Sequence, residues 1–303
     1  MTEITTDRFA VSLPQQISDG AFDPAAFRAY LRRAEELGFH SAWTREGTLN
    51  PAPTLGPIEV MTYAAACTER LRLGCAVFVS VVHSPLHLAK SLSTLDQLSR
   101  GRLEVGFGLG SRNLLGPFGV SPEGFVTRFT EGIELMKVCW SEPKVAFHGR
   151  FFQVEAAMEP KAYQKPHPPV WMGGHQPAAI RRAIRHGDGF VGAGGATTAA
   201  FAGQVRTLRA ELERAGRDPA SFRVAKRVYV SVGATGRIEG PLSRMYGNAD
   251  MAVSGPPDAC AQGLSEVLEA GADLVLLDTM SDEAEQLERL AGEVLPSLLQ
   301  QGP

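Results

Sequence analysis

Stretches of apolar residues recur along the chain and alternate with segments in which apolar positions repeat at helical spacing. Residues 71–110 show the unit most clearly: two strands, 71–79 and 103–107, are apolar on both faces, and a helix lies between them. Strands of this kind are typical of a parallel sheet that is covered by helices on each side. The predicted strands are residues 9–14, 41–43, 71–79, 103–107, 170–172, 189–193, 223–232 and 273–277.

The helical segments between these strands carry start and stop signals. Asp23 and Pro24 suit the start of the first helix, and Gly38 suits its end. A later helix is predicted to start at Ser84 and to end before Gly101. Its apolar face is predicted to be Leu88, Leu92, Leu95 and Leu98. Other helices are predicted to start near residues 121–122, 176–177, 197–198, 257–258 and 281–282.

Eight strands that mostly alternate with helices predict a closed (β/α)8 barrel, the TIM barrel of the α/β class, built from a single domain over residues 1–303. A doubly wound open sheet is the alternative. Two segments depart from the repeat. Residues 142–169 contain two short β-like pieces and a proline-rich stretch, and residues 233–256 are rich in Gly, Ser and Asn without a helical period. We expect both to be insertions at the carboxyl-terminal face that wall the site.

Composition excludes several classes of function. The chain has 303 residues, a net charge of -3 and scattered Lys and Arg, so it has no basic stripe of the kind that nucleic acid requires. Its four cysteines show no CxxC spacing, its longest apolar run is too short to cross a membrane, and its polar start does not resemble a signal peptide. These features predict a reduced, cytoplasmic protein that acts on a small molecule.

Glycine-rich segments follow three of the predicted strands. Glycines let the backbone approach a flat or charged ligand closely, and the glycine pair after residues 170–172 is followed at once by a helix start. Free N–H groups at a helix start favour an anion, so this pair is a candidate phosphate site; an ordinary βα turn is the alternative. The candidate cofactor-binding residues in these segments are Gly108, Leu109, Gly110, Gly173, Gly174, His175, Gly192, Ala193 and Gly194.

Charged residues at strand ends are the candidates for chemistry. Glu46 follows a strand and could act as an acid or orient a cofactor, or else form a solvated pair with Arg45. Lys226 and Arg227 lie within a strand, where a charge needs a partner or a ligand. We expect one of them to face the site and the other to face the helix layer.

Metal binding and covalent hydrolysis have little support in the sequence. His83 and His87 are four residues apart, but a helix starts between them, so the two need not share a face. The histidines form no cluster of the kind that a zinc site requires, and we expect no metal. A GxSxG nucleophile motif does not occur.

These segments together resemble the bacterial luciferase-like monooxygenase superfamily, in particular its branch that depends on the deazaflavin coenzyme F420. The resemblance extends from Phe27 to Pro296. Its most specific segments are AEELGF (34–39), AACTERLRLG (65–74), HSP (83–85) through AK (89–90), TLDQLSRGRL (94–103), PHPPVWMGG (166–174), RRA (181–183) and GDGF (187–190).

The resemblance implies a flavin-type ring across the carboxyl-terminal mouth of the barrel. Members of the family have a cis peptide bond that does not involve proline at the end of strand 3, and the matching bond here joins Ala76 and Val77. By the same comparison, residues 108–111 flank the ring or its ribityl chain, and residues 173–175 meet the phosphate. Homodimerisation is a further expectation from the family.

The sequence also departs from the family pattern. Many deazaflavin members have Asp-His at the end of strand 2, where this chain has Glu46 and Gly47, and an acidic residue of a sugar-phosphate-oxidising relative corresponds to Ser111. Glu46 and Ser111 are therefore the candidate catalytic residues. The leading hypothesis is hydride transfer between F420 and a small organic substrate. The alternatives are an FMN-dependent monooxygenase that uses O₂ and a separate reductase, and a flavin-binding barrel without catalysis.

Overall fold

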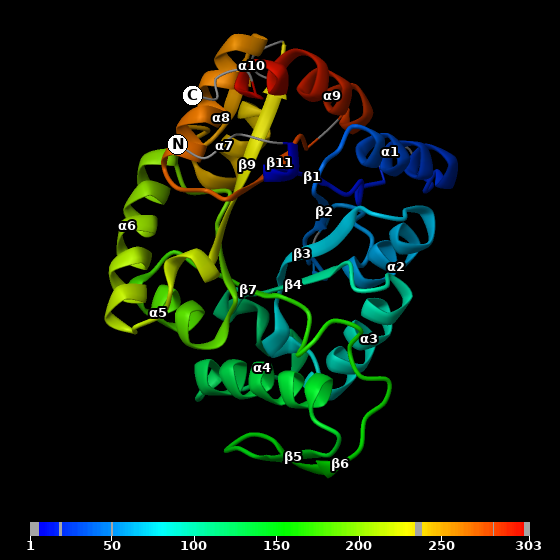
Figure 1. Cartoon of the computed structure of the whole chain (residues 1–303), viewed down its shortest axis with the longest axis vertical. Helices are drawn as coiled ribbons and strands as arrows, with labels where there is room; N and C mark the ends of the chain where they lie inside the picture. The colour runs from blue at the N-terminus through cyan, green and yellow to red at the C-terminus, as the bar shows by residue number, and fades with distance from the viewer. Residues whose placement is uncertain (1–5, 18–19, 50, 234–237, 281, 300–303) are drawn as a thin grey trace.

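A computed structural model of the chain confirms the predicted barrel (Figure 1). It describes residues 6–17, 20–49, 51–233, 238–280 and 282–299. Parallel strands follow one another around the barrel, and β8 pairs with β9 to close it. The barrel strands are β1 (Phe9–Ser12), β2 (Ser41–Thr44), β3 (Arg72–Phe78), β4 (Leu103–Phe107), β7 (Val170–Gly173), β8 (Gly189–Gly192), β9 (Arg223–Val232) and β11 (Leu274–Asp278).

Helices surround the barrel strands on the outside (Figure 1). The helices are α1 (Pro24–Glu36), α2 (Pro57–Cys67), α3 (Pro85–Leu98), α4 (Phe125–Ser141), α5 (Pro177–His186), α6 (Thr198–Arg214), α7 (Glu239–Tyr246), α8 (Pro257–Glu269), α9 (Glu283–Arg289) and α10 (Leu295–Leu299). None of the helices in the described ranges combines the length and the apolar character that a membrane span needs.

The local signals for helix ends are largely confirmed. The Asp23 side chain accepts hydrogen bonds from Ala25 N (2.8 Å) and Ala26 N (3.1 Å), which are free N–H groups at the start of α1. Two predictions were wrong in detail. α4 begins at Phe125, after Gly124 in a left-handed conformation, and not near residues 121–122. Leu98 at the end of α3 is 60% exposed, so it does not belong to the buried face.

One of the two insertions lies elsewhere than predicted. Residues 142–169 connect α4 to β7 and therefore leave from and return to the amino-terminal end of the barrel, where Gln164 Nε2 donates to Leu103 O at the start of β4 (2.8 Å). They form the hairpin of β5 (Val145–His148) and β6 (Gln153–Ala156), which lies beyond α4 (Figure 1). The placement of this insertion at the carboxyl-terminal face is thus corrected.

The second insertion does lie after β9, on the side where the strands end. It contains α7 and the short strand β10 (Val253–Gly255), which pairs with β9. The expectation of a segment without helical structure up to residue 256 was therefore wrong. Residues 234–237 of this insertion, and residue 281 of the last predicted helix start, lie outside the described residues.

The apolar residues on the two faces of the barrel strands belong to two different clusters. The smaller cluster contains only strand side chains and fills the barrel interior, and it includes Trp43 and Trp171 with ring centroids 5.9 Å apart. The larger cluster joins the opposite faces of the strands to the surrounding helices. Successive side chains of a strand point to opposite faces, so both faces of every barrel strand are covered.

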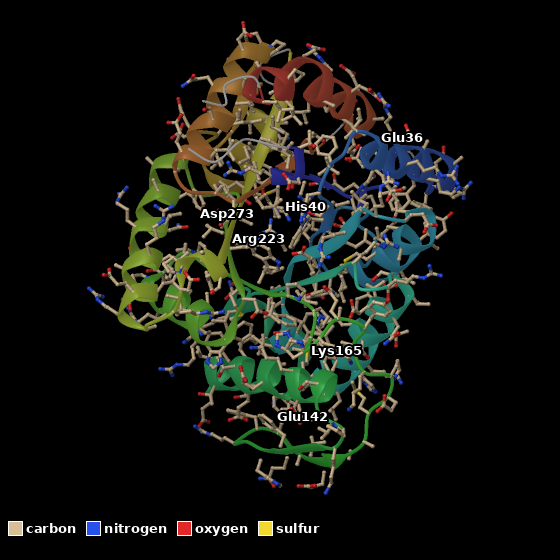
Figure 2. The ribbon with its side chains drawn as sticks, viewed as in Figure 1. Glu36, His40, Glu142, Lys165, Arg223 and Asp273 are labelled. Carbon is tan, nitrogen blue, oxygen red and sulfur yellow. The ribbon has the colours of Figure 1, made fainter. Side chains whose placement is uncertain are left out.

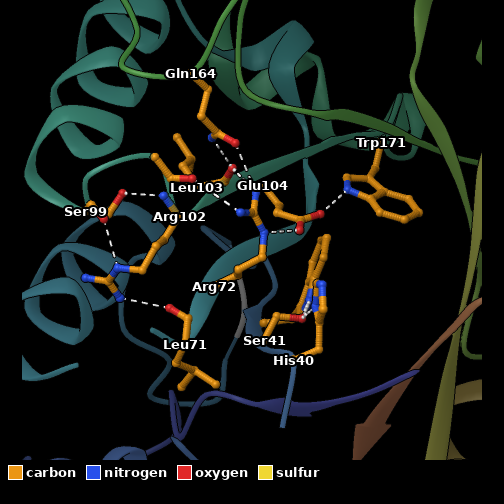
Figure 3. A network of polar contacts seen from close by, with 12 residues as sticks. His40, Ser41, Leu71, Arg72, Ser99, Arg102, Leu103, Glu104, Gln164 and Trp171 are labelled. Atoms are coloured by element: carbon orange, nitrogen blue, oxygen red, sulfur yellow. Dashed lines mark hydrogen bonds and ion pairs between the residues drawn. The ribbon is translucent and has the colours of Figure 1, made fainter. Parts of the chain in front are cut away.

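A polar network lies at the start of the strands and closes the amino-terminal end of the barrel (Figure 3). Glu104 is buried, and its two carboxylate oxygens accept from Arg72 Nε and from Trp171 Nε1, each at 2.5 Å. Figure 2 shows His40 and Arg223, which also lie at strand starts, in the middle of the barrel, whereas Glu142 lies at the periphery. The interior charge of Glu104 is thus fully paired, as burial requires.

Glu104→Ala is expected to lower the free energy of unfolding by about 3 kcal/mol, because it leaves Arg72 and the Trp171 indole N–H without their buried partner. Urea unfolding followed by fluorescence measures the change. Glu288→Ala is the control, since it removes one partner of an exposed ion pair with Arg33 and is expected to leave stability essentially unchanged. Equal effects of the two substitutions would contradict the role given to Glu104.

Candidate functional site

A cavity of about 550 Å³ opens at the carboxyl-terminal ends of the strands. This is the end at which barrel enzymes hold their ligands. All of the residues predicted to bind a cofactor line it. The lining consists of Arg45, Ala76, Val77, Gly108, Leu109, Gly110, Gly173, Gly174, His175, Gln176, Ala178, Ala179, Arg182, Val191, Gly192, Ala193, Gly194, Arg227, Tyr229 and Tyr246.

A bulge at the end of β3 forms the floor of the cavity. The Ala76–Val77 peptide bond is cis, as the resemblance implied, and the pairing of β3 with β4 shifts register between Cys75 and Phe78. The Val77 side chain reaches over the ends of β4 and β7, the next two strands of the barrel. A Cβ atom at Gly173 would lie 2.9 Å from Val77 Cγ1, and one at Gly108 would be closer still to Val77 Cγ2. A side chain at either position would therefore displace Val77.

The start of α5 forms one wall of the cavity. Gln176 precedes the helix, and its carbonyl accepts from Ala179 N (2.8 Å) and Ile180 N (3.1 Å), so the N–H groups before these remain outside the helical ladder. Arg182 lies on the same helix, and partial burial lowers the pKa of its guanidinium. Among the described residues Arg182 has no carboxylate partner, and its guanidinium lies 5.9 Å from the centre of the Phe129 ring. Helix N–H groups and an unpaired guanidinium together favour an anion.

Lys226 and Arg227 point to opposite sides of β9, as predicted. Lys226 faces the helix layer, where its Nζ lies 6.0 Å from the centre of the Phe201 ring of α6 and donates to Ala193 O (2.6 Å). Burial, with a smaller effect of the neighbouring Arg227, lowers the pKa of Lys226 to about 7. Lys226 therefore holds the loop after β8 from the helix side, and its own side chain does not line the cavity.

Arg227 faces the barrel interior and joins three strands beneath the cavity. Its guanidinium donates to Asp278 Oδ2 (2.6 Å), to Ala76 O (2.9 Å) and, more weakly, to Thr44 O (3.4 Å). The side chains of both Arg227 and Asp278 are less than a tenth exposed. Arg45 lies 3.6 Å from the same Asp278 oxygen. Two guanidinium groups thus share one carboxylate at this point.

Two tyrosines close the side of the cavity nearest the second insertion. Tyr229 of β9 and Tyr246 of α7 are joined through their hydroxyl groups at 2.8 Å. Burial, and secondarily Tyr246, raises the pKa of Tyr229, so this phenol stays protonated and can donate. α7 packs on the barrel through Leu242, in one cluster with Ile238 and Tyr229. The insertion thereby places a phenol at the rim.

The two candidate catalytic residues do not line the cavity. Glu46 Oε1 pairs with His83 Nε2 (2.6 Å) and its Oε2 accepts from Val79 N (2.6 Å), so it links the loops after β2 and β3. Glu46 and Arg45 therefore do not form the solvated pair that was the alternative. Ser111 is exposed and caps a short 3₁₀ turn by accepting from Asn113 N (3.3 Å). Catalytic roles for Glu46 and Ser111 stay predictions.

Several cavity residues were missed by sequence analysis. Tyr229 and Tyr246 were not singled out, and neither was Asp278 behind the cavity, whereas Arg182 was named within a family segment but was given no role. Tyr229 lies within the predicted strand 223–232, two positions after Arg227 and so on the same face, and Asp278 directly follows the predicted strand 273–277, so the strand pattern could have indicated both. Within the described ranges, no group of three or more His, Cys, Asp and Glu side chains is arranged to hold a metal ion.

Comparisons with known proteins agree with the fold and give a family match. The family profile described as luciferase-like monooxygenase matches residues 6–237. An F420-dependent glucose-6-phosphate dehydrogenase from Beutenbergia cavernae is 30% identical over 327 residues, which cover 91% of this chain and 94% of that protein. Two further curated relatives match over shorter stretches, and the chain spans 56% and 62% of their lengths.

Solved structures show the same fold at low sequence identity. The monooxygenase RslO1 from Streptomyces bottropensis has a TM-score of 0.80 at 23% identity, and the alignment covers 96% of this chain and 99% of that one. The coenzyme F420-dependent tetrahydromethanopterin reductase from Methanopyrus kandleri also has a TM-score of 0.80, at 21% identity and with the same coverage of both chains. Identities this low show a shared fold only.

Lys226→Met is expected to stabilise the protein more at pH 6 than at pH 9, each time relative to the wild type. The pKa of Lys226 falls from 10.5 to about 7 on folding, so the unfolded chain binds more protons between these values and wild-type stability rises with pH across this window. The methionine variant lacks this dependence. The difference in free energy of unfolding, measured with urea at both pH values, must therefore shrink as the pH rises.

Lys144→Met is the control, because the Lys144 side chain is 74% exposed. It is expected to change stability equally at both pH values. A Lys226→Met difference that does not vary with pH would contradict the burial of a charge at this position.

Proposed function

The chain belongs to the luciferase-like monooxygenase family, and from this premise we propose that it transfers a hydride between the deazaflavin F420 and a small organic substrate. The observation that carries the proposal is the lining of the cavity. The bulge at Val77, the glycines opposite it and the start of α5 all meet in one space.

The cavity has the features that a flat ring with an acidic side chain requires. Its floor and walls include Ala76, Val77, Leu109 and Val191, which offer apolar surface to a ring. The glycines at 108 and 173 keep the backbone free of side chains next to Val77. The start of α5 and Arg182 offer N–H donors and a positive charge for a phosphate. Apolar and cationic parts thus occur together, as such a cofactor needs.

The protein contributes binding and orientation, whereas a bound deazaflavin supplies two-electron hydride chemistry. In this proposal residues 173–175 and Arg182 hold the phosphate. Val77 supports the ring, and Arg227 fixes the position of the bulge by donating to Ala76 O at 2.9 Å. The linked phenols of Tyr229 and Tyr246 border the remaining space and can donate a hydrogen bond to a substrate oxygen.

The similarity over nearly the full chain to an F420-dependent dehydrogenase supports the deazaflavin. The substrate of that relative is not carried over, since Glu46 is turned towards His83 and Ser111 stands where an acidic residue was expected. Homodimerisation stays a prediction from the family resemblance.

An FMN-dependent monooxygenase is the second candidate. The observation that favours it is the family match over residues 6–237, which is described as luciferase-like monooxygenase. Free reduced FMN also reacts with O₂, so the distinguishing result is incorporation of oxygen into a substrate when protein, reduced FMN and O₂ are all present.

Titration of the purified protein with oxidised F420 and with FMN tests the cofactor. Trp43 and Trp171 lie in the barrel interior in one cluster with Ala76, and their fluorescence is expected to be quenched as the cavity fills. We expect saturable binding of F420 in the micromolar range and weaker binding of FMN. Saturation by FMN alone would overturn the F420 proposal in favour of the monooxygenase.

Arg182→Gln is expected to weaken binding of F420 about tenfold, because a charge-assisted contact to a phosphate contributes about 1.5 kcal/mol or more. Fluorescence titration measures the dissociation constant. Arg185→Gln removes the same charge from an exposed position of α5 that does not line the cavity, so it serves as the matched control. If both variants bind F420 equally well, the phosphate does not lie at Arg182.

A further inference from the structure

The cavity has a second cationic region that the phosphate site does not explain. Arg45 follows β2 and Arg227 lies on β9, whereas Arg182 lies on the helix after β7. In the barrel order β2, β3, β4, β7, the strands that lead to Arg45 and to Arg182 are three positions apart. The two regions therefore lie on different sides of the barrel mouth.

Of the two arginines in the second region, Arg227 is fully engaged within the protein. It is buried, pairs with Asp278 at 2.6 Å and also donates to the backbone carbonyls of Ala76 and Thr44. The single negative charge of Asp278 is thus neutralised by Arg227 at close range. Removal of either partner would leave the other charge buried and without a partner.

Arg45 is the cation in excess. Its Nη1 lies 3.6 Å from Asp278 Oδ2, farther than the 2.6 Å contact of Arg227, and its side chain is 28% exposed while lining the cavity. Among the described residues its guanidinium has no other carboxylate partner. The cavity lining contains arginines but no Asp or Glu among the described residues, so the positive charge is not balanced there.

The backbone of Arg45 is fixed by a buried glutamine. Arg45 N donates to Gln15 Oε1 (2.8 Å), and Gln15 Nε2 donates to Arg45 O (3.0 Å) and to Leu55 O (3.0 Å). Gln15 is only 6% exposed. The protein therefore holds both the N–H and the C=O of Arg45 in place, which restricts the position from which its guanidinium reaches the cavity.

We propose that Arg45 is a specificity-determining residue that binds the carboxylate of an organic acid substrate. A guanidinium presents paired N–H donors that match the two oxygens of a carboxylate, and a partly buried site strengthens their attraction. The ring of Tyr229, which also lines the cavity, offers apolar surface to the hydrocarbon part of such an acid. This inference rests on the proposed function and names the substrate class for the same cavity.

Benzoate and its uncharged analogue benzamide are suitable probes, because they have nearly the same shape and differ in charge. We expect calorimetric titration of the F420-loaded protein at fixed ionic strength to show benzoate binding at least tenfold tighter than benzamide. Arg45→Gln is expected to abolish this preference, and Arg45→Lys to retain part of it. The affinity for F420 is expected to stay within twofold of the wild-type value in both variants.

Arg181→Gln is the control for the loss of one positive charge, since Arg181 lies on α5, pairs with Glu211 and is outside the cavity lining. It is expected to keep the preference for benzoate. Circular dichroism and thermal unfolding of each variant establish that it is folded. If Arg45→Gln does not fold, the preference for benzoate is measured with Arg45→Lys instead.

Three results would overturn the inference: no detectable benzoate binding, equal binding of benzoate and benzamide by the wild type, or a large loss of F420 affinity in Arg45→Gln, which would assign Arg45 to the cofactor. Failure of the proposed function is a different result, because the wild type would then not bind F420 at all. In that case the same titrations with the ligand-free protein decide whether Arg45 selects carboxylates.

Discussion

The packing of the Val77 side chain against two glycines determines the shape of the cavity. Val77 occupies the space that side chains at Gly108 and Gly173 would fill, so three neighbouring strands meet at one apolar contact. The two glycines therefore matter because they have no side chain that would collide with Val77. A larger residue at either position would collide with Val77 and would move the bulge at the end of β3. The shape of the apolar cavity floor therefore depends on this contact and not on a polar group.

Charged residues are distributed around this contact according to the side of the sheet that they face. Lys226 and Arg227 are adjacent in sequence, yet one supports the loop after β8 from the helix layer and the other ties β9 to β3 and β11 inside the barrel. Alternation along the strand places them apart. The charge inside the barrel is paired with Asp278, so the cationic groups at the rim are left to interact with ligands.

Much of the fold could be predicted because its signals are local. Apolar strands, an Asp-Pro helix start and glycines after strands are each read from a few consecutive residues, and the cavity collects the glycine segments as expected. α7 was missed because Gly240 and Pro241 near its start hide the helical pattern, while its stability comes from Leu242 packing in a cluster with Tyr229. The pairing of Glu46 with His83 was missed because the two residues are far apart in sequence. The connection from α4 to β7 was misplaced although topology decides it, since a helix that follows a barrel strand returns the chain to the amino-terminal end.

The sealed amino-terminal end of the barrel limits how molecules can come and go. Trp43 and Trp171 fill the interior, and the Arg72–Glu104 pair lies beneath them, so within the described residues there is no passage along the barrel axis. Along the barrel axis, a molecule can therefore enter and leave only at the mouth. A large flat molecule resting across that mouth would trap whatever lies below it, and turnover would then follow a fixed order of arrival and departure.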